Sequence, residues 1–149
     1  RRQRQMCIRD RNLLDRRWPI YSRTPSCPPA YVGSKADIGN SAVAKGCEVL
    51  GEVKNSVLSY NTQVGEGAVV SYSVLMPGAV VESGAVVQYA IVGENCRIGR
   101  DAQVGAPPET AQDPDDWGVA VLGPGTVIGD GEIVPAKTLL DRHHGEVKA

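Results

Sequence analysis

The side chains with the clearest chemical potential lie outside the regular part of the sequence. The only two histidines, His143 and His144, are in the polar C-terminal tail. Asp113, Asp115 and Asp116 lie in a proline-rich stretch with no fourth oxygen ligand at a fixed spacing, so we expect them to be solvated rather than to bind a metal ion. Neither a Gly-x-x-x-x-Gly-Lys phosphate loop nor a strand-bound Gly-x-Gly-x-x-Gly occurs. We therefore predict no catalytic, cofactor-binding or metal-binding residue in this chain.

The regular part of the chain is an internal repeat, and such a repeat decides the fold before any local pattern does. Three of its units are seventeen residues long and the second is two residues shorter. Aliphatic residues recur mostly six apart, with one five-residue step per unit. They are Val32, Ile38, Val43, Val49, Leu58, Val64, Val70, Leu75, Val81, Val87, Val92, Ile98 and Val104.

A step of six fits neither an α-helix nor a long strand, but it suits a short strand followed by a sharp corner, three times per turn of a triangular coil. Coils of this kind stack about 4.8 Å apart. The period predicts an all-β fold, a left-handed parallel β-helix of hexapeptide repeats with about five to six coils. Glycines that follow an aliphatic residue or precede a small one are expected at corners, because glycine tolerates a positive φ. They are Gly33, Gly46, Gly65, Gly67, Gly78, Gly84 and Gly99.

A smaller inward position precedes most of the aliphatic residues by two. It holds Ala36, Cys47, Thr62, Ala68, Ala79, Ala85, Cys96 and Ala102. Cys47 and Cys96 occupy it three coils apart, which is about 14 Å at the interstrand spacing and too far for a disulfide. We expect both to be small buried thiols. Without a signal peptide, a long apolar run or an Asn-x-Ser/Thr site, the chain is predicted to be cytoplasmic.

The sequence divides into three parts. Residues 1–28 combine a segment that could form a helix with a proline-rich linker, 29–140 form the repeat domain with a loop at 105–118, and 141–149 form a polar tail that we expect to fray. Repeat arrays need covered ends, so the N-terminal segment is expected to cover one end and Leu139–Leu140 with the tail the other.

Seven arginines and two aspartates make residues 1–17 strongly basic, although the whole chain has a net charge of −1. A basic arm can bind nucleic acid, but no aromatic residues are interleaved for base stacking. We favour a surface segment that packs on a neighbouring domain, and we predict neither a nucleic-acid nor a membrane partner.

The runs WPIYSR (18–23), PPAYV (28–32), IGNSAVAKGCEVLGEVKNSVL (38–58) and VGEGAVVSYSVLMPGAVV (64–81) carry a family resemblance. From about Leu13 to Leu140 the sequence resembles the C-terminal β-helix of bacterial glucose-1-phosphate adenylyltransferase. The resemblance implies a parent enzyme that makes ADP-glucose and pyrophosphate from ATP and glucose 1-phosphate in glycogen synthesis. It also implies that chemistry with ATP and Mg²⁺ belongs to a separate N-terminal catalytic domain, so that this chain alone is inactive.

The family resemblance also implies partners. In that family the β-helix contacts the catalytic domain, holds a homotetramer together and responds to a phosphorylated sugar effector bound by cations between the domains. Arg16, Arg17 and Arg23 flank the linker and are the candidate effector ligands here, although they could equally pair with acids of the catalytic domain. Three tyrosines are candidate interface residues that would share one corner, or would merely cover an exposed edge. They are Tyr60, Tyr72 and Tyr89.

Two other function classes remain open. A free-standing hexapeptide acyltransferase would need a histidine base at a coil edge, which no repeat carries. A β-helix scaffold with no enzymatic parent would need no such group.

Overall fold

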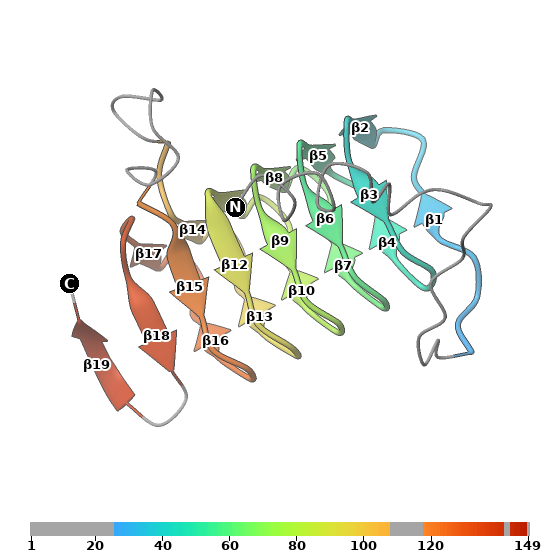
Figure 1. Ribbon diagram of the computed structural model, residues 1–149. Helices are drawn as coiled ribbons and strands as arrows, with labels where there is room; N and C mark the ends of the chain where they lie inside the picture. Colours follow the sequence, from blue (N-terminus) through green and yellow to red (C-terminus); the bar gives the residue numbers. More distant parts are fainter. Residues whose placement is uncertain (1–25, 108–117, 142–143, 149) are drawn as a thin grey trace, which may run out of the picture.

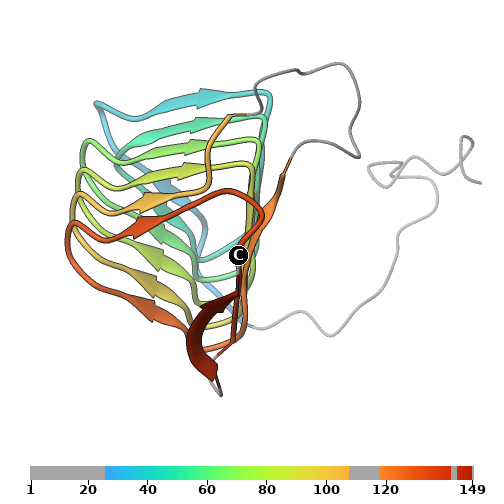
Figure 2. The same ribbon diagram turned by 90° about the vertical axis from the view of Figure 1, so that its left-hand side faces the viewer.

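The computed structural model describes residues 26–107, 118–141 and 144–148 of the 149-residue chain, the last segment by its backbone. These residues wind into a triangular coil whose turns are stacked (Figures 1 and 2). Each turn gives one short strand to each of three parallel sheets, here called sheets A, B and C. The described part of the chain contains no helix, and hence none that could cross a membrane. The expected helix within residues 1–28 lies outside the described residues.

From β1 to β18 the strands pass from sheet A to sheet B to sheet C in chain order. Sheet A consists of β1 (Tyr31–Val32), β4 (Glu48–Val49), β7 (Gln63–Val64), β10 (Val80–Val81), β13 (Arg97–Ile98) and β16 (Val127–Ile128). Sheet B consists of β2 (Asp37–Gly39), β5 (Glu52–Lys54), β8 (Val69–Ser71), β11 (Val86–Gln88), β14 (Gln103–Val104) and β17 (Ile133–Val134). Sheet C consists of β3 (Ala42–Val43), β6 (Val57–Leu58), β9 (Val74–Leu75), β12 (Ala90–Val92), β15 (Ala120–Leu122), β18 (Leu139–Asp141) and β19 (His144–Lys148).

This arrangement confirms the predicted left-handed parallel β-helix. We number the six coils from the sheet A strands that begin them, so that coil 1 starts at β1 and coil 6 at β16. Neighbouring coils pair in register, as Val49 with Val64 and Val64 with Val81. Because side chains alternate in a strand, every coil sends the equivalent residue of each strand inward.

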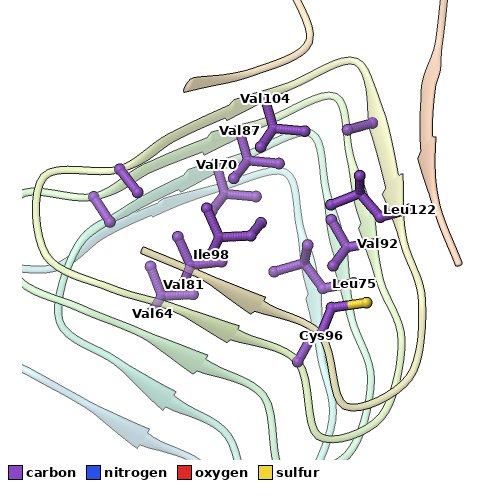
Figure 3. Packing of buried hydrophobic residues seen from close by; sticks show 14 of the residues in the cluster. Val64, Val70, Leu75, Val81, Val87, Val92, Cys96, Ile98, Val104 and Leu122 are labelled. Atoms are coloured by element: carbon purple, nitrogen blue, oxygen red, sulfur yellow. The ribbon is translucent and has the colours of Figure 1, made fainter. Parts of the chain in front are cut away.

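The inward side chains form three columns, one under each sheet (Figure 3). The members at most 3% exposed are Val49, Val64, Val81, Ile98 and Ile128 under sheet A, Val53, Val70, Val87, Val104 and Val134 under sheet B, and Leu58, Leu75, Val92 and Leu122 under sheet C. Full burial of such a side chain stabilises the fold by about 1.5–3 kcal/mol. The small inward positions from Cys47 to Ala102 are buried too, whereas Ala36 in coil 1 is only partly buried. Cys47 and Cys96 are free thiols, as predicted.

Val53 is a core residue that the six-residue period does not identify. It follows Val49 by four residues instead of six, because coil 2 turns from sheet A to sheet B in two fewer residues than its neighbours. Gly51 lies in this short corner and is buried. A Cβ at Gly51 would be 2.4 Å from the carbonyl oxygen of Ala68 and 2.7 Å from that of Gly65, so only glycine fits the tight corner.

The corner glycines serve two different purposes. Gly84 has a φ of +74°, as expected for a corner residue. Gly65, which follows an aliphatic residue, has no positive φ, so the expected reason is wrong at this position. A Cβ there would be 2.7 Å from the backbone nitrogen of Ser83 in the next coil, and glycine is needed because the coils approach closely.

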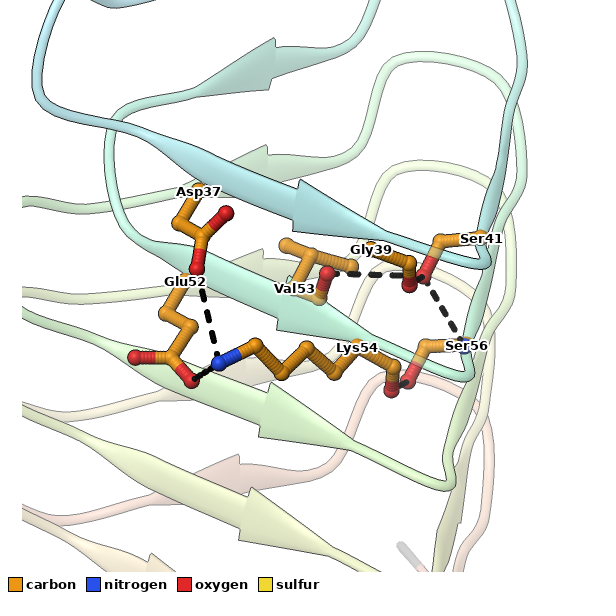
Figure 4. Close-up of polar contacts among 7 residues, drawn as sticks. All are labelled: Asp37, Gly39, Ser41, Glu52, Val53, Lys54 and Ser56. Atoms are coloured by element: carbon orange, nitrogen blue, oxygen red, sulfur yellow. Dashed lines mark hydrogen bonds and ion pairs between the residues drawn. The ribbon is translucent and has the colours of Figure 1, made fainter.

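Serine side chains tie successive coils together at the corner between sheets B and C. The Oγ of Ser41 accepts a hydrogen bond from the backbone N–H of Ser56 at 3.1 Å. Ser56 does the same for Ser73, and Ser73 for Ala90, each at 3.2 Å. Figure 4 shows the first step of this ladder. It also shows Lys54, whose Nζ lies 2.6 Å from Glu52 Oε1 and 3.4 Å from Asp37 Oδ2 on the outside of sheet B.

The two ends of the solenoid differ. In coil 1 the inward Val32 is 49% exposed, whereas Ile128 and Val134 in coil 6 are buried. At the C-terminal end β19 pairs antiparallel with β18. The tail that was expected to fray therefore forms a strand over residues 144–148, because the edge of β18 offers backbone groups for it to pair with.

Candidate interaction surfaces

The outward positions of the three sheets differ in character. Sheet A presents Tyr31, Glu48, Gln63, Val80, Arg97 and Val127. Sheet B presents Asp37, Glu52, Val69, Val86, Gln103 and Ile133. Sheet C presents Ala42, Val57, Val74, Ile91, Val121 and Leu139, a set we call the sheet C row. Only the sheet C row lacks charged and hydrogen-bonding side chains altogether.

The outside of sheet A carries an open recess of about 280 Å³ at its corner with sheet B. Glu82 lies in its wall with the side chain 19% exposed, and it binds Arg97 and Arg100 at once. Arg97 Nε donates to Glu82 Oε1 at 2.8 Å, and Arg100 Nε is 3.4 Å from Oε2. Because the carboxylate already pairs with both guanidinium groups, this cluster links coils 4 and 5 and offers no free acid or base.

A second recess, of about 340 Å³, lies at the open N-terminal end. Cys27, Val43 and Lys45 are among its lining residues. The N–H of Gly46 donates to the carbonyl of Pro28 at 2.8 Å, which fixes the incoming chain beside this recess. The described residues that line the recess include no histidine or carboxylate to activate the thiol, so we assign it no chemistry.

Tyr72 and Tyr89 stack on each other at the corner between sheets B and C. Their ring centroids are 4.8 Å apart and the rings are inclined by 9°. Both residues adopt a positive φ, of +48° and +47°. The end of β14 in sheet B and the start of β15 in sheet C lie at the same corner. Tyr60 lies elsewhere, in the turn from sheet C to sheet A, so the expectation that three tyrosines share one corner is wrong for Tyr60.

Arg16, Arg17 and Arg23, the predicted effector ligands, lie outside the described residues. So do the loop aspartates and His143, for which the sequence predicts no binding role. His144 begins β19. Within residues 26–107 and 118–141 no group of three or more potential metal ligands comes together.

Among the described residues, the pKa is shifted for Cys96 and Lys54. Burial raises the pKa of the Cys96 thiol above its ordinary 9.0, and hydrogen bonds near Thr126 partly oppose this. The thiol lies 3.0 Å from the carbonyl oxygen of Gly123. Hydrogen bonds to Glu52 and then Asp37 raise the pKa of the exposed Lys54. The described residues thus form a stack of coils whose three outer faces differ in character.

Comparison with known proteins agrees with this description. The chain is 48% identical over 69 residues to glucose-1-phosphate adenylyltransferase of Clostridioides difficile and 47% identical over 70 residues to that of Bacillus anthracis. These matches cover 46% and 47% of this chain but only 18% and 19% of the relatives. The resemblance noted from the sequence is therefore confirmed over less than a fifth of the length of these enzymes.

Among the solved structures that match are two acetyltransferases. The acetyltransferase domain of PglB from Neisseria gonorrhoeae, in complex with acetyl coenzyme A, is 24% identical and matches over 75% of this chain and 51% of that domain, with a TM-score of 0.43. Perosamine N-acetyltransferase from Caulobacter crescentus is 18% identical and matches over 82% of this chain and 54% of that one, with a TM-score of 0.38. The sequence family with the description "GlmU-like, C-terminal hexapeptide" matches residues 29–128. With two thirds of its length within that match, this chain belongs to the GlmU-like, C-terminal hexapeptide family.

Proposed function

We propose that this chain is the hexapeptide-repeat part of a glucose-1-phosphate adenylyltransferase, the enzyme that forms ADP-glucose and pyrophosphate from ATP and glucose 1-phosphate in glycogen synthesis. The observation that carries the proposal is the 48% identity over 69 residues to the Clostridioides difficile enzyme. The repeat itself constrains mainly the inward aliphatic position and the small one, which are two positions in six. The 48% identity is higher than the one third of positions that the repeat constrains. It therefore extends to outward and corner residues that the fold alone leaves free.

Within this enzyme the chain would serve assembly and regulation. A separate nucleotidyltransferase domain would bind ATP and Mg²⁺, since the match spans only 18% and 19% of the length of the relatives. Its expected partners are that domain and further subunits of a cytoplasmic homotetramer. A solenoid with a fully packed core suits the role, because its faces can hold partners without deforming.

We further infer that a phosphorylated sugar effector binds at the basic segment through Arg16, Arg17 and Arg23. Guanidinium groups bind phosphate by paired hydrogen bonds, and these arginines flank the start of the linker. In an enzyme that contains this chain, the Arg16→Ala, Arg17→Ala, Arg23→Ala triple variant is expected to lose activation by the effector while keeping its basal rate. Unchanged activation would remove the inference.

A domain exchange tests the proposed function. The matching region of the Clostridioides difficile enzyme is replaced by this chain, and pyrophosphate release from ATP and glucose 1-phosphate is measured together with the mass of the assembly. We expect an active, assembled hybrid, and no pyrophosphate release from the 149-residue chain alone. The matched control carries Val70→Asp, which places a charge in the core and should abolish assembly.

Two results would contradict the proposal. A hybrid that folds but neither assembles nor turns over would show that this chain cannot replace the relative's repeats. Release of coenzyme A from acetyl coenzyme A by the isolated chain would instead indicate an acyltransferase, for which residues 1–142 supply no histidine base.

A further inference from the structure

The outer face of sheet C stands apart from the other faces along its whole described length. Every member of the sheet C row is aliphatic, and Leu139 is 62%, Val57 46% and Ile91 39% exposed. Within two residues of the six members, the only charged residues are Lys137 and Asp141, both beside Leu139 at the C-terminal end of the row. Sheets A and B, by contrast, carry Glu48, Arg97 and other charges on their outward rows.

The row is continuous because neighbouring strands pair directly through its members. Ala42 is in register with Val57, and Val74 with Ile91. The sheet C strands β3, β6, β9, β12, β15 and β18 lie side by side along this face (Figure 1). Six strands spaced by about 4.8 Å make a strip about 24 Å long. An uninterrupted aliphatic strip of this length is uncommon on a surface that stays in water and marks an interaction site.

The order of side-chain sizes along the row indicates what covers it. The smallest member, Ala42, lies at one end, and the most exposed large one, Leu139, lies at the other. A second copy placed with its axis antiparallel puts Leu139 of one copy over Ala42 of the other. A parallel arrangement would place Ala42 on Ala42 and leave a gap, with the two large Leu139 side chains crowded at the far end.

We propose that the sheet C row is a two-fold interface between two copies of this chain. The two-fold axis lies in the interface, runs along the strands and passes between β9 and β12. It places Val74 opposite Ile91 of the second copy, in the isologous manner of a symmetric dimer. This proposal rests on the face alone and does not depend on the adenylyltransferase assignment.

The area of the face indicates a contact at the weak end of specific interfaces. A strip about 24 Å long and about 15 Å wide buries on the order of 500 Å² per copy once surface relief is included, which is near the lower limit for a specific interface. We expect the isolated chain to dimerise with a Kd on the order of 10–100 µM. Within a larger enzyme, further contacts would add to it.

Sedimentation velocity of the 149-residue chain from about 5 µM to about 500 µM tests the proposal, since the range brackets the expected Kd. The wild-type chain should pass from monomer to dimer. Ile91→Lys, at the centre of the face, should raise the Kd at least tenfold. The matched control is Ile133→Lys on sheet B, whose side chain is even more exposed at 68% and which should leave the Kd unchanged. Circular dichroism melting of each variant verifies the fold.

A charge pair tests the antiparallel arrangement itself. Ala42→Lys and Leu139→Glu should each weaken the dimer, and the double variant should recover to within about threefold of wild type because the new charges oppose each other across the interface. Combining Ala42→Lys with Ile91→Glu is the control. Those two positions are offset by two strands across the dimer, so no recovery is expected.

Three outcomes would overturn the proposal. The first is a wild-type chain that stays monomeric at about 500 µM, well above the expected Kd. The second is a dimer that Ile133→Lys disrupts and Ile91→Lys does not. The third is equal recovery in both double variants, which would contradict the antiparallel pairing.

Discussion

The Cα of Gly51 lies so close to the next coil that a Cβ on it would be 2.4 Å from the carbonyl oxygen of Ala68. The neighbouring atoms are backbone and cannot move aside without distorting coil 3. We predict that Gly51→Ala lowers the free energy of unfolding by about 2–4 kcal/mol, in the upper range for single substitutions. Urea unfolding followed by circular dichroism measures the change.

Gly39→Ala is the matched control for this substitution. Gly39 lies in β2, and a Cβ there would meet only Lys54 Cγ at an ordinary 3.5 Å. Its effect should stay within about 0.5 kcal/mol. Equal losses in the two variants would show that the short corner of coil 2 is not a tight one.

The serine ladder predicts a second, smaller effect. Ser56→Ala removes the oxygen that accepts the hydrogen bond of the Ser73 N–H. A buried donor left without a partner costs about 1–3 kcal/mol, so the variant should be destabilised by this amount in the same unfolding assay. Ser83→Ala, at an exposed position, is the control and should have almost no effect. A neutral Ser56→Ala would mean that the ladder contributes nothing to stability.

The inward residues were predictable because one rule covers them. A step of six identified columns such as Val64, Val81 and Ile98, and the buried pair Cys47 and Cys96. The step of six did not identify Val53, because the short corner places it four residues after Val49. The pairing of Val49 with Val64 and of Val53 with Val70 shows where the period changes.

The corners were less predictable, because their conformation depends on what the next coil presents. Asn55 and Tyr72 adopt a positive φ although neither is glycine. They occupy equivalent places in successive coils, where each corner residue lies on the previous one. Tyr60 looked like a member of the tyrosine group by spacing, yet it is in another corner. Tyr60 follows Leu58 by two residues, as Tyr72 follows Val70. The two six-residue units belong to sheets C and B, so the shared spacing does not give a shared corner.

The raised pKa of the Cys96 thiol predicts a loss of stability in alkaline solution. In the unfolded chain this thiol releases its proton near the ordinary pKa of 9.0, whereas burial keeps it protonated in the folded chain. Its contribution is fully present below pH 9 and decreases as the pH rises above 9. The largest slope from one such group is about 1.4 kcal/mol per pH unit.

Cys96→Ala isolates this contribution, because coil 4 already carries Ala79 at the equivalent position. The difference in unfolding free energy between wild type and variant should be constant from pH 7 to about 8.5 and shrink towards pH 10 as the wild-type advantage disappears. Parallel curves over the whole range would show that the buried thiol titrates as it does in water.

The central claim is that this chain works as the assembly part of an adenylyltransferase, and the coding sequence upstream of Arg1 tests it most directly. We predict one continuous reading frame that encodes a nucleotidyltransferase domain of a few hundred residues, with a glycine-rich nucleotide loop and metal-binding acids. A start codon immediately before Arg1, or an unrelated domain in that frame, would contradict the account.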